Sequence, residues 1–249
     1  RNDMKVINDI TYFKENKLDI YLPDKNCFST VIYFHGGGIV GGDKQEYREH
    51  GEFLAERGIC FVSANYSLYP NTEFPLFIED AAECVNWVYS NIKNYGKCDN
   101  FYIGGSSAGA FISLMLCFDG KYLKAHNIEN VKGYIHNAGQ PTAHFNVLKY
   151  SGYDSRRVIV DETAPLYYVG TTDLNQNMLI MFSDKDMENR YEQSQLLLST
   201  LKHFNYINIK HKIFENTGHC EQDFAHCENG DNVLAKTIYD YVAEIEGKL

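Results

Sequence analysis

The 249-residue sequence lacks any apolar run close to the roughly 20 residues that a membrane-spanning helix needs. It also lacks an excess of basic residues, because 33 acidic residues against 23 lysines and arginines give a formal net charge of −10. This balance argues against a nucleic-acid-binding surface and offers no basic patch to anionic lipids. We therefore expect no nucleic-acid partner and no membrane association.

Paired cysteines are missing as well. The seven cysteines are an odd number, are scattered through apparent strands and helices, and include no C-x-x-C pair. This distribution indicates reduced, mostly buried thiols rather than a disulfide framework, and it favours a cytoplasmic location. No signal peptide is visible, although a sequence that begins at Arg1 leaves a removed leader open.

No internal repeat, low-complexity tract or linker divides the chain. Hydrophobic residues make up 44% and charged residues 22%, which is typical of a globular protein with a full core. An α/β fold of this length is usually one domain, so we predict a single domain over residues 1–249.

Short apolar runs alternate with helical periodicities along the chain. An antiparallel hairpin is predicted within residues 10–22, and buried strands are predicted at 30–34, 59–64, 101–103, 131–137, 178–182 and 207–214. Helices are predicted at 46–57, 75–92, 191–204, after residue 107 and near the C-terminal end. This alternation predicts an α/β fold with a mostly parallel sheet and helices on both faces. Residues 139–176 lack clean periodicity, and we predict a cap-like excursion over the sheet with one or two short helices.

The stretch from Asn100 to Phe118 joins an apolar run, a glycine- and serine-rich turn, and an apolar segment of helical length. Its turn contains G-x-S-x-G, with Gly105, Ser107 and Gly109 as the fixed letters. A sharp strand-to-helix turn strains the serine and raises its hydroxyl above the sheet, while side chains at the flanking positions would collide with neighbouring elements. The following helix aims free N–H groups and its positive dipole end at the same point. The pattern predicts Ser107 as a nucleophile.

Three further features follow predicted strands, where open α/β sheets place their sites. His35 precedes three consecutive glycines at 36–38, whose backbone N–H groups are suited to stabilising an oxyanion. His219 lies on the loop after the last strand, where a general base can reach the serine hydroxyl, and His226 is its nearby rival.

The third feature is the acidic group Asp184-Lys185-Asp186, directly after a predicted strand. A carboxylate at this point can accept the second N–H of the histidine, which fixes its tautomer and stabilises the imidazolium. Either aspartate meets this requirement.

A zinc site is the competing interpretation of the same region. The pairs His219-Cys220 and His226-Cys227 are seven residues apart and lie beside Glu221 and Asp223. Zinc ligands have to converge in a tetrahedron, adjacent residues rarely bind one ion together, and this spacing matches no common zinc pattern. We therefore predict neither a metal nor an organic cofactor.

Taken in chain order, these motifs resemble the hormone-sensitive-lipase-like esterases of the α/β-hydrolase fold, especially their small bacterial members. The matching segments are His35 to Gly38, Asn65 to Pro70 with Phe74-Pro75 and Asp80, Gly105 to Gly109, and Thr217 to His219. The resemblance implies a catalytic triad of Ser107, Asp186 and His219, in the order serine, acid, histidine. Asp186 is preferred to Asp184 because related esterases hold the acid in a G-x-x-D type turn. The resemblance also implies that Gly37, Gly38 and Ala108 donate the N–H groups of the oxyanion hole.

Two departures from the family pattern affect the expected site. Ser106 stands where many members have an acidic residue, and fewer than ten residues precede the first strand where many members carry an N-terminal cap. We therefore expect a minimal cap and an open, shallow, apolar-walled pocket, roofed by residues 139–176 and those after His219. Its candidate lining residues are Tyr150, Tyr167, Tyr168 and Phe224, whereas Asp80 is expected to be structural, bonding loops beneath the site.

The expected function is a serine carboxylesterase that hydrolyses short-chain acyl esters through an acyl-enzyme. An amidase such as a formamidase, or a sugar-ester deacetylase, uses the same triad and stays open. A non-catalytic small-molecule receptor is the alternative of another class, favoured only if the nucleophile or base were missing. The expected partner is a small-molecule ester, and a homodimer stays open beside a monomer.

Overall fold

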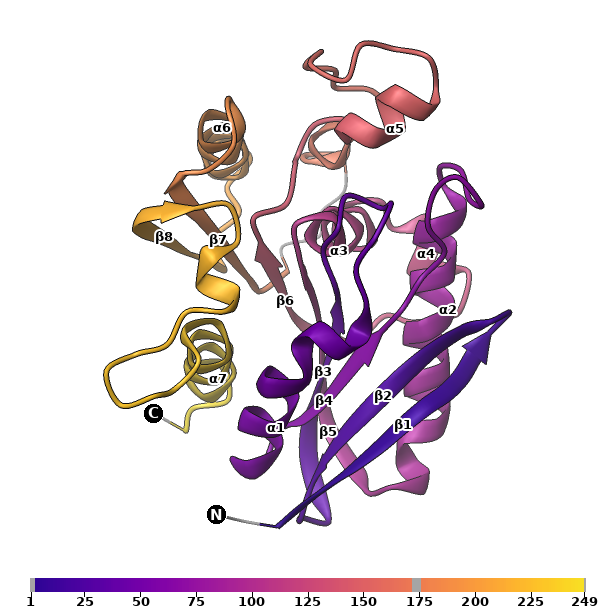
Figure 1. The fold of residues 1–249 in the computed structure, drawn as a ribbon, viewed down its shortest axis with the longest axis vertical. Helices are drawn as coiled ribbons and strands as arrows, with labels where there is room; N and C mark the ends of the chain where they lie inside the picture. The colour runs from indigo at the N-terminus through magenta and orange to yellow at the C-terminus, as the bar shows by residue number, and fades with distance from the viewer. Residues whose placement is uncertain (1–2, 172–175, 249) are drawn as a thin grey trace.

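Eight strands form a single sheet in the computed structural model, which describes residues 3–171 and 176–248 (Figure 1). The strands are β1 (Met4–Phe13), β2 (Asn16–Pro23), β3 (Cys27–Phe34), β4 (Cys60–Ala64), β5 (Lys97–Ser106), β6 (Val131–Asn137), β7 (Met178–Lys185) and β8 (Ile209–Gly218). Their order across the sheet is β1-β2-β4-β3-β5-β6-β7-β8. β2 pairs antiparallel with β1 and β4, and all other neighbours are parallel. The predicted mostly parallel α/β sheet is confirmed.

Helices cover both faces of this sheet. They are α1 (Arg48–Glu56), α2 (Leu76–Asn91), α3 (Ala108–Phe118), α4 (Lys121–Lys124), α5 (Phe145–Tyr150), α6 (Arg190–His203) and α7 (Val233–Ile245). Ile32 of β3 packs in an apolar layer with α2, α3 and α6, whereas Val31 and Tyr33 pack in a second layer with α1 and α7. Successive residues of a strand face opposite sides, so a strand covered on both faces has to be apolar throughout. This explains the continuous apolar run of β3.

Most predicted elements are confirmed, with differences at their ends. The edge hairpin begins earlier than predicted, at Met4, and β7 and β8 run on to Lys185 and Gly218. The helix predicted at 46–57 begins as a 3-10 turn over Lys44–Tyr47 and continues as α1. Helix α4 was not predicted, because one turn is too short to show a period.

The predicted excursion leaves the sheet after β6 and includes α5 and a 3-10 turn at Pro165–Tyr168. Figure 1 shows this segment beyond the end of the sheet, above α3. Backbone hydrogen bonds close it on itself, from Ala143 N–H to Ile159 O (2.9 Å) and from Leu166 N–H to Pro141 O (2.9 Å). The two short helices agree with the prediction, and residues 172–175 of the predicted excursion lie outside the described residues.

All seven cysteines are free thiols, as predicted. The expectation that they are mostly buried is wrong, because only Cys60, Cys84 and Cys117 are buried and Cys27 is exposed. Within residues 3–171 and 176–248, none of the helices combines the length and the apolar character needed to cross a bilayer.

Asp80 is a buried carboxylate that joins two loops at the edge of the sheet. Its Oδ1 lies 3.1 Å from Lys14 Nζ in the β1–β2 turn. Its Oδ2 accepts hydrogen bonds from Asn16 Nδ2 (3.3 Å) and from the N–H of Ser67 (3.2 Å). These contacts agree with the predicted structural role, because they tie the hairpin to the loop after β4.

We expect Asp80→Ala to lower the free energy of unfolding by about 2 to 4 kcal/mol, because it leaves the Ser67 N–H and the Asn16 amide without their acceptor. Urea unfolding followed by circular dichroism measures the change. Glu79→Ala is the matched control on the same helix, since Glu79 is exposed, and its effect should stay within about 0.5 kcal/mol. Similar losses in both variants would contradict a structural role for Asp80.

Candidate active site

The turn between β5 and α3 holds Ser107 in a strained conformation. Its φ of 53° and ψ of −114° are unusual for a residue with a side chain. A Cβ at Gly105 would lie 2.3 Å from Gly109 O, and a Cβ at Gly109 would lie 1.9 Å from Phe34 O, so both positions require glycine. The Ser107 N–H donates to Asn137 O (2.8 Å) at the end of β6, which anchors the turn to the neighbouring strand. These contacts explain the G-x-S-x-G pattern sterically.

Three predicted residues from separate loops meet at this turn. Ser107 Oγ lies 2.7 Å from His219 Nε2, and His219 Nδ1 lies 2.7 Å from Asp186 Oδ1. The Asp186 side chain is fully buried, while the imidazole remains 22% exposed and can be reached by a substrate. The N–H of Met187 also donates to Asp186 Oδ1 (2.6 Å), which fixes the carboxylate. The arrangement is a continuous hydrogen-bonded relay from carboxylate to imidazole to hydroxyl.

The alternative acid, Asp184, is directed elsewhere. Its Oδ2 accepts from the N–H of Asn216 (2.9 Å) and its Oδ1 from the N–H of Thr217 (3.1 Å). These two backbone hydrogen bonds hold the pKa of the Asp184 carboxyl below its ordinary value. Asp184 therefore braces the end of β8, and only Asp186 contacts His219. The alternative base, His226, lies 2.5 Å from Glu49 on the surface.

The glycine loop after β3 lies against the nucleophile. A Cβ built on Gly36 would be 3.3 Å from Ser107 Cβ, so the loop passes directly beside the hydroxyl. Gly37 and Gly38 have φ values of +117° and +66°, which side chains rarely tolerate. Within the described part of the chain, nothing accepts a hydrogen bond from the N–H of Gly37, Gly38 or Ala108. These unused donors are in the region where an oxyanion would form, and their catalytic role stays a prediction.

His35 supports the glycine loop from below. Its ring is buried, stacks on Tyr66 with centroids 4.6 Å apart, and places Nδ1 2.6 Å from Gly36 O. The Tyr66 hydroxyl donates to His35 O (2.6 Å). Burial lowers the pKa of His35, which favours the neutral imidazole. His35 and Tyr66 therefore shape the loop and do not face the triad.

A buried polar network beneath Ser107 was missed by the sequence analysis. Asn137 Nδ2 donates both to Ser106 Oγ (2.9 Å) and to Asp223 Oδ1 (2.7 Å). The hydroxyls of Tyr33 and Tyr47 complete it, at 2.7 Å from Ser106 Oγ and from Asp223 Oδ2 respectively. Burial raises the pKa of Asp223. These hydrogen bonds hold the loop after His219 under the turn that carries Ser107. Many members of the family have an acidic residue at the position of Ser106; in this chain the carboxylate of Asp223 belongs to the same hydrogen-bond network.

The sequence patterns did not predict the contact between Asn137 and Asp223 beneath Ser107. The one available signal was the polar side chain of Asn137 at the end of a strand, because strand ends meet at one edge of the sheet. Asp223 drew attention only as a zinc ligand, and no group of three or more metal-binding side chains occurs among residues 3–171 and 176–248.

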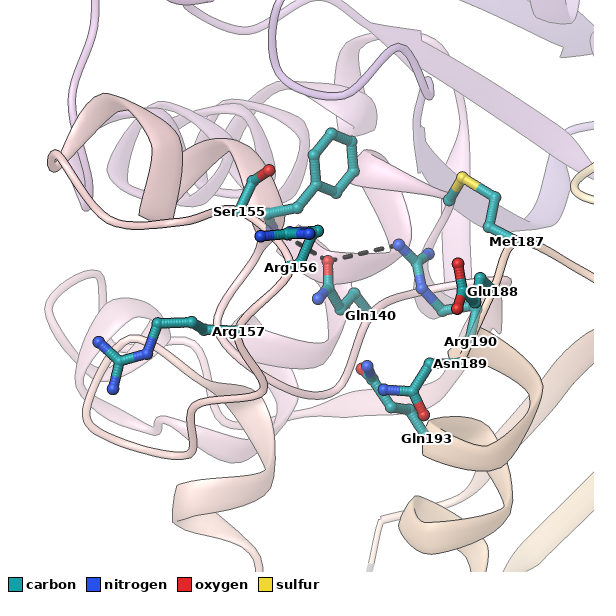
Figure 2. Close-up of a pocket in the computed structure, with 10 residues that line it drawn as sticks. Gln140, Ser155, Arg156, Arg157, Met187, Glu188, Asn189, Arg190 and Gln193 are labelled. Atoms are coloured by element: carbon teal, nitrogen blue, oxygen red, sulfur yellow. Dashed lines mark hydrogen bonds between the residues drawn. The ribbon is translucent and has the colours of Figure 1, made fainter.

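A cavity of about 390 Å³ lies between the excursion and the start of α6 (Figure 2). Polar and apolar atoms contribute equally to its walls, although most of the lining residues are polar or charged: Gln140, Phe145, Ser155, Arg156, Arg157, Met187, Glu188, Asn189, Arg190 and Gln193. None of the four candidate aromatics is among these described lining residues. Tyr150 stacks on Tyr69 instead, with centroids 4.1 Å apart, and Phe224 packs near Tyr47.

Comparison with known proteins gives one family match. The sequence model of the BD-FAE family matches residues 18–152, which include the glycine loop and the turn of Ser107. The probable isoprenylcysteine alpha-carbonyl methylesterase ICMEL1 of Oryza sativa subsp. japonica is 33% identical over 114 residues, which are 44% of this chain and 27% of that protein. The kynurenine formamidase of Danio rerio is 30% identical over 120 residues, 47% of this chain and 40% of that protein. The chain thus spans well under half the length of these relatives.

Solved structures match over nearly the whole chain. A truncated form of a carbohydrate esterase from gut microbiota superposes with a TM-score of 0.78 at 19% identity, covering 98% of this chain and 97% of that one. Esterase B from Lactobacillus rhamnosis superposes with a TM-score of 0.77 at 17% identity, covering 99% and 87%. At these identities the likeness establishes the α/β-hydrolase fold and nothing about substrate.

Proposed function

This chain belongs to the BD-FAE family of α/β-hydrolase-fold esterases, and we propose that it is a serine hydrolase of carboxylic esters. The observation that carries the proposal is the hydrogen-bonded relay of Asp186, His219 and Ser107, with both links at 2.7 Å. An isolated serine hydroxyl is a weak nucleophile, and a base held in this way by a buried carboxylate is what activates it.

In the proposed acylation step, Ser107 Oγ attacks the ester carbonyl while His219 Nε2 takes the hydroxyl proton. Asp186 stabilises the imidazolium through its contact with Nδ1. The tetrahedral oxyanion accepts hydrogen bonds from the backbone N–H groups of Gly37, Gly38 and Ala108. His219 then returns the proton to the departing alcohol, and an acyl-enzyme remains.

Deacylation repeats these steps with water. His219 takes a proton from water as the water oxygen attacks the acyl-enzyme carbonyl, and the same backbone donors hold the second oxyanion. The imidazolium then protonates Ser107 Oγ as the acid leaves. Partial exposure of the imidazole allows water to enter once the alcohol has left.

We place the preference at short acyl chains. Most of the residues that line the cavity are polar or charged, and Phe145 and Met187 are the apolar ones. A long acyl chain would gain little from such walls, since its favourable binding depends on removing apolar surface from water. Acetyl and propionyl groups have little apolar surface, so their binding depends much less on apolar walls.

Amide or formamide hydrolysis is the second candidate, and the similarity to kynurenine formamidase favours it. The same relay serves this reaction, because His219 can protonate a leaving amine as well as an alkoxide. Relative rates on matched ester and amide substrates separate the two activities.

A series of nitrophenyl esters from acetyl to dodecanoyl, with an aryl formamide beside it, tests the proposal. We expect the highest kcat/KM from acetyl to butyryl and a fall of at least about tenfold by octanoyl. A maximum at dodecanoyl would contradict the short-chain preference. Turnover of the formamide alone would replace the esterase by the amidase, and turnover of neither would remove both.

A further inference from the structure

The cavity beside the relay gathers a large share of the scarce arginines. The sequence contains six arginines, and three of them, Arg156, Arg157 and Arg190, line this one cavity. The chain as a whole carries a net charge of −10, so its average field repels anions. The three arginines at this cavity therefore create a local positive charge that can attract an anion.

Arg190 is the most informative of the three. Its side chain is 5% exposed, and its Nη1 and Nη2 donate only long hydrogen bonds, to Ala138 O and Gln140 Oε1, each at 3.3 Å. Figure 2 shows the guanidinium directed toward Gln140. Guanidinium carries five N–H donors, so three of them meet no acceptor within the described part of the chain. A buried cation with spare donors is costly unless an anion completes it.

The carboxylates near the cavity do not neutralise this cation. Within the described ranges no Asp or Glu oxygen lies within 4.0 Å of the Arg190 guanidinium, whereas Arg156 pairs with Asp154 at 2.6 Å. Glu188 also lines the cavity, and its charge acts on Arg156. Burial lowers the pKa of Arg190 although Asp186 opposes this effect, which is consistent with a missing partner. Figure 2 shows Arg157 directed away from the others, at the rim.

The cavity adjoins the catalytic relay on two sides. Arg190 is the first residue of α6 and lies four residues beyond Asp186 in the chain, and Met187, next to Asp186, also lines the cavity. On the opposite wall, the Phe145 ring lies 3.6 Å from a Cβ built on Gly38, and the neighbouring Asn146 Nδ2 donates to Gly38 O (2.6 Å). The cavity is thus lined by a residue next to the carboxylate of the relay and by a residue that contacts the glycine loop beside Ser107.

We propose that this cavity is a carboxylate subsite, and that the preferred substrate of Ser107 is an ester that carries a free carboxylate. Arg190 binds this carboxylate, and Arg156 faces it from the rim of the cavity. The inference rests on the proposed hydrolase function and adds its substrate class. Arginine suits this task because its planar fork binds both oxygens of a carboxylate. The carboxylate belongs either to the acid half or to the alcohol half of the ester, and the two pairs of esters described next distinguish these cases.

Two pairs of esters differ only by a carboxylate in place of a methyl group. Monomethyl glutarate against methyl valerate places the charge on the acid half, and 3-acetoxypropionate against propyl acetate places it on the alcohol half. Hydrolysis is followed by acid release in a pH-stat. We expect the charged member of at least one pair to have a kcat/KM at least about tenfold above its neutral partner.

Arg190→Gln should lower the charged-to-neutral ratio of kcat/KM by about 10- to 100-fold, because one charge-assisted pair is lost. Arg156→Gln, at the exposed rim, should lower it by about 3- to 10-fold and keeps the test available if Arg190→Gln does not fold. Arg48→Gln is the control, since Arg48 is exposed and paired with Glu52 far along the chain, and it should leave the ratio unchanged. An unchanged ratio in Arg190→Gln or, should that variant not fold, in Arg156→Gln overturns the subsite.

Calorimetric titration with glutarate separates this proposal from the hydrolase function. Glutarate should bind the wild type more tightly than its neutral diamide, glutaramide, does, and the difference should shrink in Arg190→Gln or, if that variant does not fold, in Arg156→Gln. If no ester is hydrolysed but this difference is found, the subsite stands and the hydrolase proposal fails. If esters are hydrolysed and glutarate binds no more tightly than glutaramide, the hydrolase stands and the subsite is wrong.

Discussion

Ser107→Ala is expected to lower kcat for short-chain nitrophenyl esters by about 10⁵- to 10⁶-fold, because it removes the only atom that can form the acyl-enzyme in the proposed mechanism. The oxyanion donors and the binding cavity stay in place, so a small residual rate above that of water should persist. Steady-state kinetics measures the loss. A fluorophosphonate probe followed by peptide mass spectrometry reports the same atom independently, since it should label Ser107 in the wild type and nothing in the variant.

The neighbouring serine provides the matched control for this experiment. Ser106 differs by one position, yet its hydroxyl is buried and bonded to Tyr33 and Asn137. Ser106→Ala should keep kcat within about tenfold of the wild type and keep the probe label, at some cost in stability. Thermal unfolding of Ser107→Ala near the wild-type temperature excludes misfolding as the cause. Retained turnover or retained labelling in Ser107→Ala would show that another group is the nucleophile.

The relay was predictable because each of its members carries a local signal. Ser107 lies between two glycines whose Cβ atoms would collide with backbone, so sterics alone impose G-x-S-x-G. His219 and Asp186 each follow a strand of a parallel sheet, and such strand ends converge at one edge. The positions of these residues after strands of one parallel sheet therefore predict that their side chains lie close together.

The network beneath the relay has no comparable signal. Asn137 and Asp223 are 86 residues apart, and their contact depends on how the loop after His219 folds back under β6. A single aspartate on an irregular loop looks the same whether it is solvated or buried. Arg190 was missed for the same reason, because its exposed fraction depends on the excursion that packs above it. The roles of these residues depend on their burial in the folded chain, which the hydrophobic periodicity of the sequence does not predict.

The choice between the two acids shows where pattern analysis needs geometry. Asp184 and Asp186 both follow the strand predicted at 178–182, but β7 extends to Lys185, so Asp184 lies within the strand and Asp186 lies beyond its end. Asp184 accepts backbone N–H groups from the end of β8, whereas Asp186 passes beyond the strand and reaches His219. Sequence resemblance selected Asp186, and the contacts give that preference a physical reason.

Asp186→Asn is therefore expected to lower kcat by about 10³- to 10⁴-fold while leaving KM within a few fold. The amide is neutral, so the imidazolium that forms on His219 loses the charge that stabilises it. If the amide turns its NH₂ toward Nδ1, the histidine also adopts the tautomer that cannot accept the Ser107 proton. Both effects act on the transition state and not on substrate binding, which is why steady-state kinetics should show the loss in kcat.

Asp184→Asn is the matched control, because it makes the same chemical change two residues away. It weakens the hydrogen bonds to Asn216 and Thr217, so it should lower stability by about 1 kcal/mol and kcat by no more than about tenfold. Equal losses of kcat in the two variants would mean that this loop acts only through its structure. A larger loss in Asp184→Asn would transfer the role of the acid to Asp184, and the relay would then have to rearrange before turnover.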